Sequence, residues 1–214
     1  NREIEVDEKS TFSDKVYSLF PKVTMTEIFY EVNGWTRVLE DFRDIDKEDK
    51  EKQKPLVAAL LAQGHNIGFS KMANSSHLNE TNLRRINEVY FTHENLCKAQ
   101  RTLVNYHHSL DIVKNWGSGQ SSSSDGMRVP ISLKTIYADY NTHYGNKGGA
   151  MYRHISDQYM PYYIQMLEAR DSVHVPDGLE YHGSDLDIKN HSTDTAGYTE
   201  QTFALLYFLG YNFR

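Results

Sequence analysis

The sequence predicts a protein of the α+β or α/β class, with an N-terminal helical region followed by a mixed sheet with flanking helices. Two observations lead to this expectation. Up to about residue 115, apolar residues recur at steps of three and four, which is the period of a helix with one buried face. After Trp116, apolar and polar residues alternate along several short segments, as they do in half-buried strands. We therefore expect a helical region at residues 1–116 and a sheet domain at residues 117–214.

The composition limits the class of protein. The 214 residues are 39% hydrophobic and 24% charged, as in globular domains, and the length suits one large or two small domains. A net charge of −6 argues against a self-sufficient DNA-binding module, although it allows a catalytic core that other segments tether to DNA. The chain begins with Asn1 and not with methionine, so we expect it to be a piece of a longer protein.

Cysteine usage and hydropathy indicate the compartment. The single Cys97 excludes a disulfide framework and fits a reducing cytosol, and we interpret it as a buried helix residue because no basic partner marks it as a reactive thiol. The longest apolar run, residues 203–209, is too short to cross a bilayer. The expectation is a cytoplasmic protein without a membrane partner.

The helical half begins with a capping box formed by Thr24 and Glu27, after which an apolar face continues as far as Phe42. The charged run at residues 41–54 is expected to be an exposed connection. Pro55 should then open a short helix that Gly64 closes. Further helices are expected at residues 69–73, 83–90 and 93–115.

The clearest helix, at residues 93–115, carries a continuous apolar seam and begins after the predicted N-cap Thr92. Such a seam is expected to pack against another helix. Its members are Leu96, Ala99, Leu103, Tyr106, Leu110 and Val113.

The second half opens with a glycine- and serine-rich loop at residues 117–124, and period-two alternation then predicts a strand at residues 127–133. Pro130 in this strand suggests an edge or a bulge. A last helix, capped by Thr199 and stopped at Gly210, is apolar nearly all round and is therefore expected to be buried. The remaining expected elements are strands near 149–156, 161–168, 187–194 and 211–213 and a helix at 176–182. This order matches a ribonuclease H-like core.

Asp125 opens the first strand of this core and Asp194 follows its fourth strand. Two carboxylates that meet at the ends of neighbouring strands could hold catalytic Mg²⁺, which prefers hard oxygen ligands. Aspartate also favours turns and helix entries, so a structural role stays open for both residues. Two such aspartates usually imply a third acid, and none is obvious before Arg214.

Several segments together resemble the Tn-three family of replicative transposases. In the sheet half they are Ser123-Ser124-Asp125-Gly126, His154-Ile155-Ser156-Asp157-Gln158-Tyr159, Tyr181-His182-Gly183-Ser184-Asp185-Leu186 and Thr193-Asp194-Thr195-Ala196-Gly197. In the helical half they are Glu31-Val32, Trp35-Thr36 and Leu60-Leu61-Ala62 with Gly64, Asn66 and Gly68. The resemblance extends from about Leu19 to Phe213, and the order and spacing of the segments make it specific.

The resemblance implies a DNA transposase with an Asp-Asp-Glu triad. Asp125 and Asp194 would be catalytic and would bind Mg²⁺, or Mn²⁺ as a substitute, while the glutamate would lie on a helix beyond Arg214. The parent enzyme would nick the 3′ ends of a transposon and join them to target DNA, as a homo-oligomer. The domains that bind the terminal repeats would lie upstream, and this piece alone would be inactive. His154 and Asp157 are second candidates for lining the active site.

Three other functions were weighed. The seam at residues 96–113 suggests a structural or dimerisation module without chemistry of its own. The His-x-x-Asp patterns at His154 and His182 suggest a His/Asp metallohydrolase, but neither has the His-x-x-x-His spacing that places two ligands on one helix face. The serines at residues 121–124 suggest a nucleophile, but no motif places a base beside them, so a flexible loop is favoured.

Overall fold

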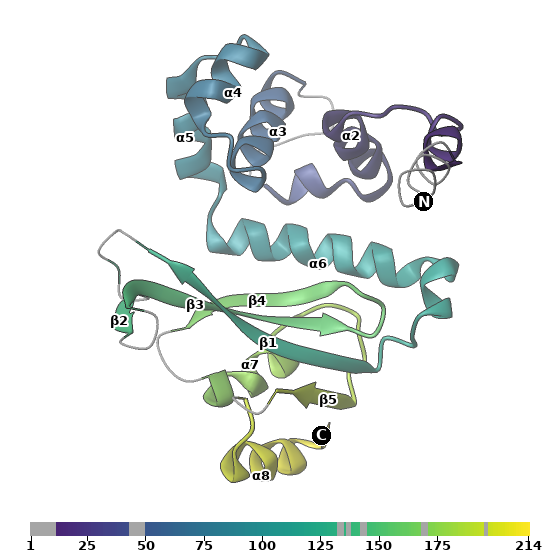
Figure 1. The fold of residues 1–214 in the computed structure, drawn as a ribbon, viewed down its shortest axis with the longest axis vertical. Coiled ribbons are helices and arrows are strands. Elements are labelled where there is room, and N and C mark those ends of the chain that lie inside the picture. Colours follow the sequence, from purple (N-terminus) through teal and green to yellow (C-terminus); the bar gives the residue numbers. More distant parts are fainter. Residues whose placement is uncertain are drawn as a thin grey trace, which may run out of the picture. The chain divides into compact units, whose positions relative to one another are not determined.

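The computed structural model describes residues 12–42, 50–131, 135, 138–141, 145–167, 171–194 and 197–214. The chain divides into two compact units (Figure 1). The helical unit comprises residues 1–40 and 44–90, and the sheet unit comprises residues 41–43 and 91–214. The long helix expected at residues 93–115 therefore belongs to the sheet unit. The functional boundary after residue 116 stays a prediction.

The helical unit contains helices α2 (Met25–Thr36), α3 (Lys50–Gly64), α4 (Phe69–Ser76) and α5 (Glu80–Tyr90). The expected capping box is confirmed, because the Thr24 side chain accepts from the Glu27 amide and the Glu27 carboxylate accepts from the Thr24 amide. The apolar face was expected to run to Phe42 in one helix. Instead α2 ends at Thr36, because Arg37 adopts a left-handed conformation with φ 59°.

The start of α3 was predicted wrongly. Pro55 lies inside the helix, so part of the charged run that was expected to be a connection is helical from Lys50 onward. A proline near a helix start removes only one backbone hydrogen bond. Burial of Leu56, Val57 and Ala59 from the same helix supplies the compensating packing. The rest of the run, residues 43–49, lies outside the described residues.

The sheet unit begins with α6 (His93–Ser109) and the 3-10 turn η2 (Asp111–Asn115). The expected cap Thr92 is confirmed, since its side chain accepts from the Asn95 amide, but the α-helix stops at Ser109. The strands are β1 (Ser121–Pro130), β2 (Asp139–Asn141), β3 (Asn146–Ser156), β4 (Pro161–Leu167), β5 (Asn190–Thr193) and β6 (Asn212–Phe213), with α7 (Val175–Glu180) and α8 (Glu200–Leu209) between them.

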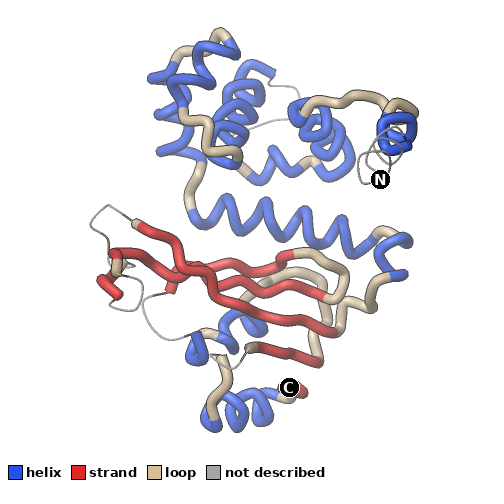
Figure 2. The backbone as a smooth tube through the Cα atoms, in the orientation of Figure 1, coloured by secondary structure: helices blue, strands red, loops and turns tan. Residues whose placement is uncertain are grey.

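β1 lies at the centre of one mixed sheet (Figure 2). It pairs antiparallel with β3 on one side and parallel with β5 on the other. β3 also pairs antiparallel with β2 and β4, and β5 pairs parallel with β6. The mixed sheet with flanking helices confirms the predicted fold class. Apart from the short strand β2, which was not predicted, its order of strands and α-helices is the one expected for a ribonuclease H-like core.

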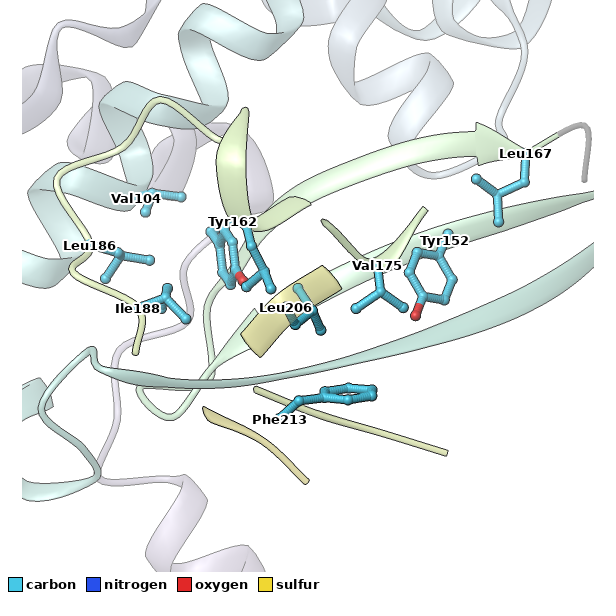
Figure 3. Close-up of a cluster of buried hydrophobic side chains, with 10 residues drawn as sticks. Val104, Tyr152, Tyr162, Leu167, Val175, Leu186, Ile188, Leu206 and Phe213 are labelled. Carbon is cyan, nitrogen blue, oxygen red and sulfur yellow. The ribbon is translucent and has the colours of Figure 1, made fainter. Parts of the chain in front are cut away.

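The core of the sheet unit is a cluster of buried aromatic and aliphatic side chains (Figure 3). Tyr152 and Tyr162 come from the sheet, Val175 and Leu206 from α7 and α8, and Val104 from α6. Residues on strands alternate between faces, so this cluster defines the covered face.

No helix in the described part of the chain is long and apolar enough to cross a membrane.

Two further expectations in this unit were wrong. The serine-rich segment is not a loop up to residue 124, because β1 already begins at Ser121. The last helix, α8, was expected to be buried, but only Thr202 and Leu206 are. Its exposed apolar side chains include Tyr207 and Phe208, with 72% and 83% of their surface accessible. An apolar composition all round a helix therefore does not establish that the helix is buried. The described residues leave most of the apolar side chains of α8 exposed.

Candidate functional site

Asp125 and Asp194 directly follow the last register pair of two neighbouring parallel strands, β1 and β5. Ser124 of β1 is paired with Thr193 of β5, and each aspartate follows its paired residue by one position. Adjacent strands are about 4.8 Å apart. The two backbone positions therefore emerge side by side where β5 ends, which is the arrangement expected from the sequence.

The end of β5 is held in place by local hydrogen bonds. The Thr193 hydroxyl donates to the Ser124 carbonyl at 3.4 Å, which ties the two strands together immediately before the aspartates. The Gly197 amide donates both to the Asp194 carbonyl at 3.2 Å and to its Oδ1 at 3.0 Å. A Cβ on Gly197 would stand 2.1 Å from the Thr193 Oγ1, so the turn requires glycine there.

Alternation along the strands separates an exposed face from a buried one. Asp125 and Asp194 are both exposed, whereas Ser124 of β1 and His191 of β5 are buried. A carboxylate on the exposed face can meet a substrate as large as DNA without rearranging the core. The buried residues beside each aspartate have side chains that point to the opposite face of the sheet, and their packing therefore fixes the position of the aspartate.

A chain of polar side chains underlies the aspartate pair on the buried face. Tyr162 donates to Ser122 Oγ at 3.1 Å, and both imidazole nitrogens of His191 lie 2.8 Å from serine hydroxyls, Nδ1 from Ser122 and Nε2 from Ser124. The Ser124 hydroxyl also lies 2.7 Å from the Tyr152 hydroxyl. These five residues come from β4, β1, β5 and β3, so the network connects four strands of the sheet.

The hydroxyl directions fit a neutral His191. If Tyr162 donates to Ser122, the Ser122 hydroxyl can donate to Nδ1, which leaves Nε2–H to donate to Ser124. Burial, together with the neighbouring His154 ring centred 5.1 Å away, lowers the pKa of His191 to about 3. An uncharged imidazole satisfies both serines without placing a charge in the core.

His154 is a core residue, not a lining residue of the exposed face. It is fully buried, its register partner is Ser124, and its Nε2–H donates to the Val175 carbonyl at 3.1 Å. Burial lowers the pKa of His154 to about 4, so its ring is neutral near pH 7. His154 therefore faces away from Asp125, although the two are neighbours in the sheet.

Asp157 holds the loop that leads into β1. Its Oδ1 accepts from the Gly119 amide at 2.8 Å and its Oδ2 from the Ser118 amide at 3.1 Å. Its own amide donates to Ser121, four residues before Asp125, a distance of about 13 Å along an extended strand. The structure thus brings together Asp125 and Asp194, and it does not bring His154 or Asp157 to them.

Arg153, the antiparallel register partner of Asp125, was not predicted from the sequence. Arg153 is exposed, like Asp125, so a cation stands beside the aspartate pair on the same face. The network residues Ser122, Ser124 and His191 were not predicted either. The sequence carries no signal for these serines, because residues 121–124 are all serine and only the structure separates Ser122 and Ser124 from their neighbours.

The aspartate pair fits a divalent metal by its chemistry. Two exposed carboxylates supply hard oxygens, and Mg²⁺ needs only one or two protein carboxylates when water and phosphate complete its shell. Within the described residues no group of three or more His, Cys, Asp or Glu side chains is gathered closely enough to hold an ion. The described part of the chain therefore offers a two-carboxylate site and not a complete protein cage.

Comparison with known proteins assigns the chain to a family. Residues 27–214 match the family model described as Tn3 transposase DDE domain. The chain is 41% identical over 214 residues to the transposase for transposon Tn1546 of Enterococcus faecium, covering 97% of this chain and 22% of that protein. It is 40% identical over 210 residues to the transposase for transposon Tn2501 of Escherichia coli, covering 95% of this chain and 21% of that protein.

A third relative, the transposase for transposon Tn501 of Pseudomonas aeruginosa, is 35% identical over 213 residues, covering 97% of this chain and 22% of that protein. The fold and the matched region define the chain as a DDE domain of transposase type. It belongs to the Tn3 transposase family, and the predicted family is confirmed. The chain spans about a fifth of the length of these relatives.

Proposed function

We propose that this chain is the part of a replicative DNA transposase that carries the two aspartates of an Asp-Asp-Glu triad. The parent enzyme nicks the 3′ ends of a transposon and joins them to target DNA by phosphoryl transfer. The observation that carries this proposal is the register of Asp125 and Asp194, which emerge side by side on an exposed face of neighbouring strands. Membership of the Tn3 transposase family supplies the reaction class.

The role of the chain in this chemistry is to hold and position. Asp125 and Asp194 would bind Mg²⁺, or Mn²⁺ in its place, and the bound ions would activate the attacking hydroxyl and stabilise the leaving oxygen. Arg153, opposite Asp125, would offer its guanidinium to a neighbouring DNA phosphate. The buried network through His191 would keep β1 and β5 in the register that the two carboxylates need.

The third acid of the triad is proposed to lie beyond Arg214 in the parent protein. Two carboxylates would hold metal less tightly than three, so the 214-residue chain alone is expected not to join DNA strands. Transposon ends and target DNA are the proposed partners of the full-length protein, which we expect to act as a homo-oligomer in the bacterial cytoplasm, where its DNA substrates lie.

The experiment that tests this proposal uses the full-length transposase. Asp125→Asn and Asp194→Asn should each abolish strand joining while leaving binding to transposon ends intact. Asp187→Asn is the matched control, because Asp187 is exposed and pairs with Lys189 at the surface at 2.8 Å. Normal joining by either site variant would refute the proposal.

The structural alternative is a dimerisation module built on the α6 seam. The burial of two residues of that seam argues against it. Ala99 and Val113 of that seam are buried, and α6 contacts β4. The metallohydrolase alternative needs His154 at a substrate, yet this side chain is fully buried and its Nε2 is bonded to Val175. We therefore keep the transposase as the proposed function.

A further inference from the structure

The helical unit contains two helices joined by a short turn, α4 and α5, separated by residues 77–79 (Figure 1). Two contacting helices joined by a turn of three residues meet the turn-length criterion of a helix-turn-helix motif, whose second helix reads the major groove of DNA. α3 contacts both helices and completes a three-helix unit. Nothing in the proposed chemistry of the sheet unit uses this feature.

The turn is fixed by its own residues. His77 adopts a left-handed conformation with φ 56°, and its amide and that of Leu78 both donate to the Ala73 carbonyl. Ala73 is buried where α4 meets its neighbours, so a small side chain lets the helices approach. Asn79 then caps α5, because its Oδ1 accepts from the Thr81 amide at 2.8 Å.

The inner face of α5 is anchored to the rest of the unit. Leu83 and Ile86 are buried, and Asn87 Oδ1 accepts from Gln63 of α3 at 2.9 Å. Arg84 is held by Glu80 at 2.6 Å and stands 5.6 Å from the centre of the Phe69 ring. These contacts fix which face of α5 points outward.

The outward face of α5 carries Thr81, Asn82 and Arg85 in the first half of the helix, all three exposed. Within the described residues, Arg85 has no ion-pair partner, in contrast to Arg84. Arginine and asparagine make bidentate hydrogen bonds to guanine and adenine edges, and threonine contacts either base type or phosphate. This is the residue chemistry of a DNA-reading helix.

The net charge of residues 50–90 has the opposite sign to that of the whole chain. Residues 50–90 contain six Lys or Arg residues and three Glu residues, a net charge of +3, whereas the chain as a whole carries −6. Lys52 of α3 lines a surface hollow together with Glu51, Asn82 and Arg85, so the hollow beside the exposed face holds two cations and one carboxylate. A segment of net positive charge in an acidic protein fits a polyanion.

We propose that α4, the turn and α5 form a duplex-DNA-binding surface, with Thr81, Asn82 and Arg85 directed into the major groove. This inference goes beyond the proposed function, because it places a DNA contact on the helical unit, apart from the aspartate pair. It requires neither metal nor phosphoryl transfer. Its failure and the failure of the catalytic proposal are therefore separable.

The test measures binding of the 214-residue chain to a fluorescein-labelled mixed-sequence duplex of about 25 base pairs, long enough for two helical turns. Fluorescence anisotropy is recorded in EDTA, so that metal binding plays no part. Arg85→Glu should weaken binding by about tenfold or more, and Asn82→Ala should weaken it in the same direction. The matched control is Lys22→Glu, a charge reversal at an exposed residue of the same unit outside the motif.

Two results would overturn the proposal. One is equal affinity of Arg85→Glu and Lys22→Glu for the duplex, and the other is the absence of measurable binding by the unaltered chain at low salt. Salt dependence gives a second readout. If Arg85 neutralises a phosphate or lies in the groove, the slope of log affinity against log salt should fall by about 1 in the Arg85→Ala variant and stay unchanged in Lys22→Ala. Thermal melting checks that the variants fold.

Discussion

Asp125 and Asp194 each follow by one residue the parallel register pair Ser124–Thr193, so two acids far apart in the sequence emerge at adjacent strand positions. The relationship depends on β1 and β5 keeping their register. That register is fixed on the buried face, where His191 bonds to Ser122 and Ser124.

Removal of the His191 side chain should destabilise the sheet unit. His191→Ala deletes a fully buried ring and leaves the Ser122 and Ser124 hydroxyls without their shared partner. The expected loss in free energy of unfolding is about 2–4 kcal/mol. Ser192→Ala is the control, because Ser192 is exposed on the opposite face and should change stability by less than about 0.5 kcal/mol. Equal urea midpoints for the two variants would contradict the network.

Stability should fall in mild acid because of the two buried histidines. The pKa values of His154 and His191 are lowered to about 4 and about 3, from an ordinary value of 6.5. Above pH 6.5 the ring is neutral in both folded and unfolded chains. Below it, the unfolded chain takes up protons that the folded chain does not, so the free energy of unfolding decreases by up to about 1.4 kcal/mol per pH unit for each histidine.

The pH effect is checked by urea unfolding between pH 7 and pH 5. His191→Asn should reduce the slope of stability against pH in this window, whatever its absolute stability, because one proton-binding difference is removed. A slope equal to that of the unaltered protein would show that His191 is not neutral and buried in the folded state.

Gly178 allows α7 to pack directly on His154. A Cβ at this position would stand 2.2 Å from the ring atoms Nδ1 and Cε1 of His154. Gly178→Ala should therefore cost about 1–3 kcal/mol of overpacking, measured by thermal or urea unfolding. In Gly34→Ala, the added Cβ meets no atom within 4 Å inside α2, and a gain of about 0.5–1 kcal/mol is expected. Opposite signs for the two alanine variants support the packing; a neutral Gly178→Ala would contradict it.

Asp157 is predicted to act on stability and not on metal binding. Asp157→Ala removes the acceptors of the Ser118 and Gly119 amides, at an expected cost of about 1–3 kcal/mol. Asp185→Ala is the control, since Asp185 is exposed and its backbone amide, not its carboxylate, donates to Asn105 Oδ1 among the described residues. A loss of Mn²⁺ binding in Asp157→Ala that is not restored by conditions stabilising the fold would instead return Asp157 to the site.

Much of the fold could be predicted from periodicity and caps. The capping box at Thr24, the cap at Thr92 and the helix between Thr199 and Gly210 are local signals that the structure confirms. The errors occurred where tertiary packing overrides local preference. Pro55 suggested a helix start but lies within α3.

The serine-rich start of β1 was missed for a similar reason. Glycine and serine usually mark loops, but here Ser122 and Ser124 are buried polar residues that need partners. Those partners, His191 and Tyr152, come from segments distant in the sequence. The adjacent positions of Asp125 and Asp194 could be anticipated from the strand order. The buried hydrogen-bond network through His191 could not.

The central claim is that Asp125 and Asp194 share a metal ion. The most direct measurement is the anomalous scattering of Mn²⁺ soaked into crystals of this chain. We predict an ion about 2 Å from a carboxylate oxygen of each aspartate. Well-ordered β1 and β5 with the two carboxylates more than about 5 Å apart, too far to share one ion, would contradict the account.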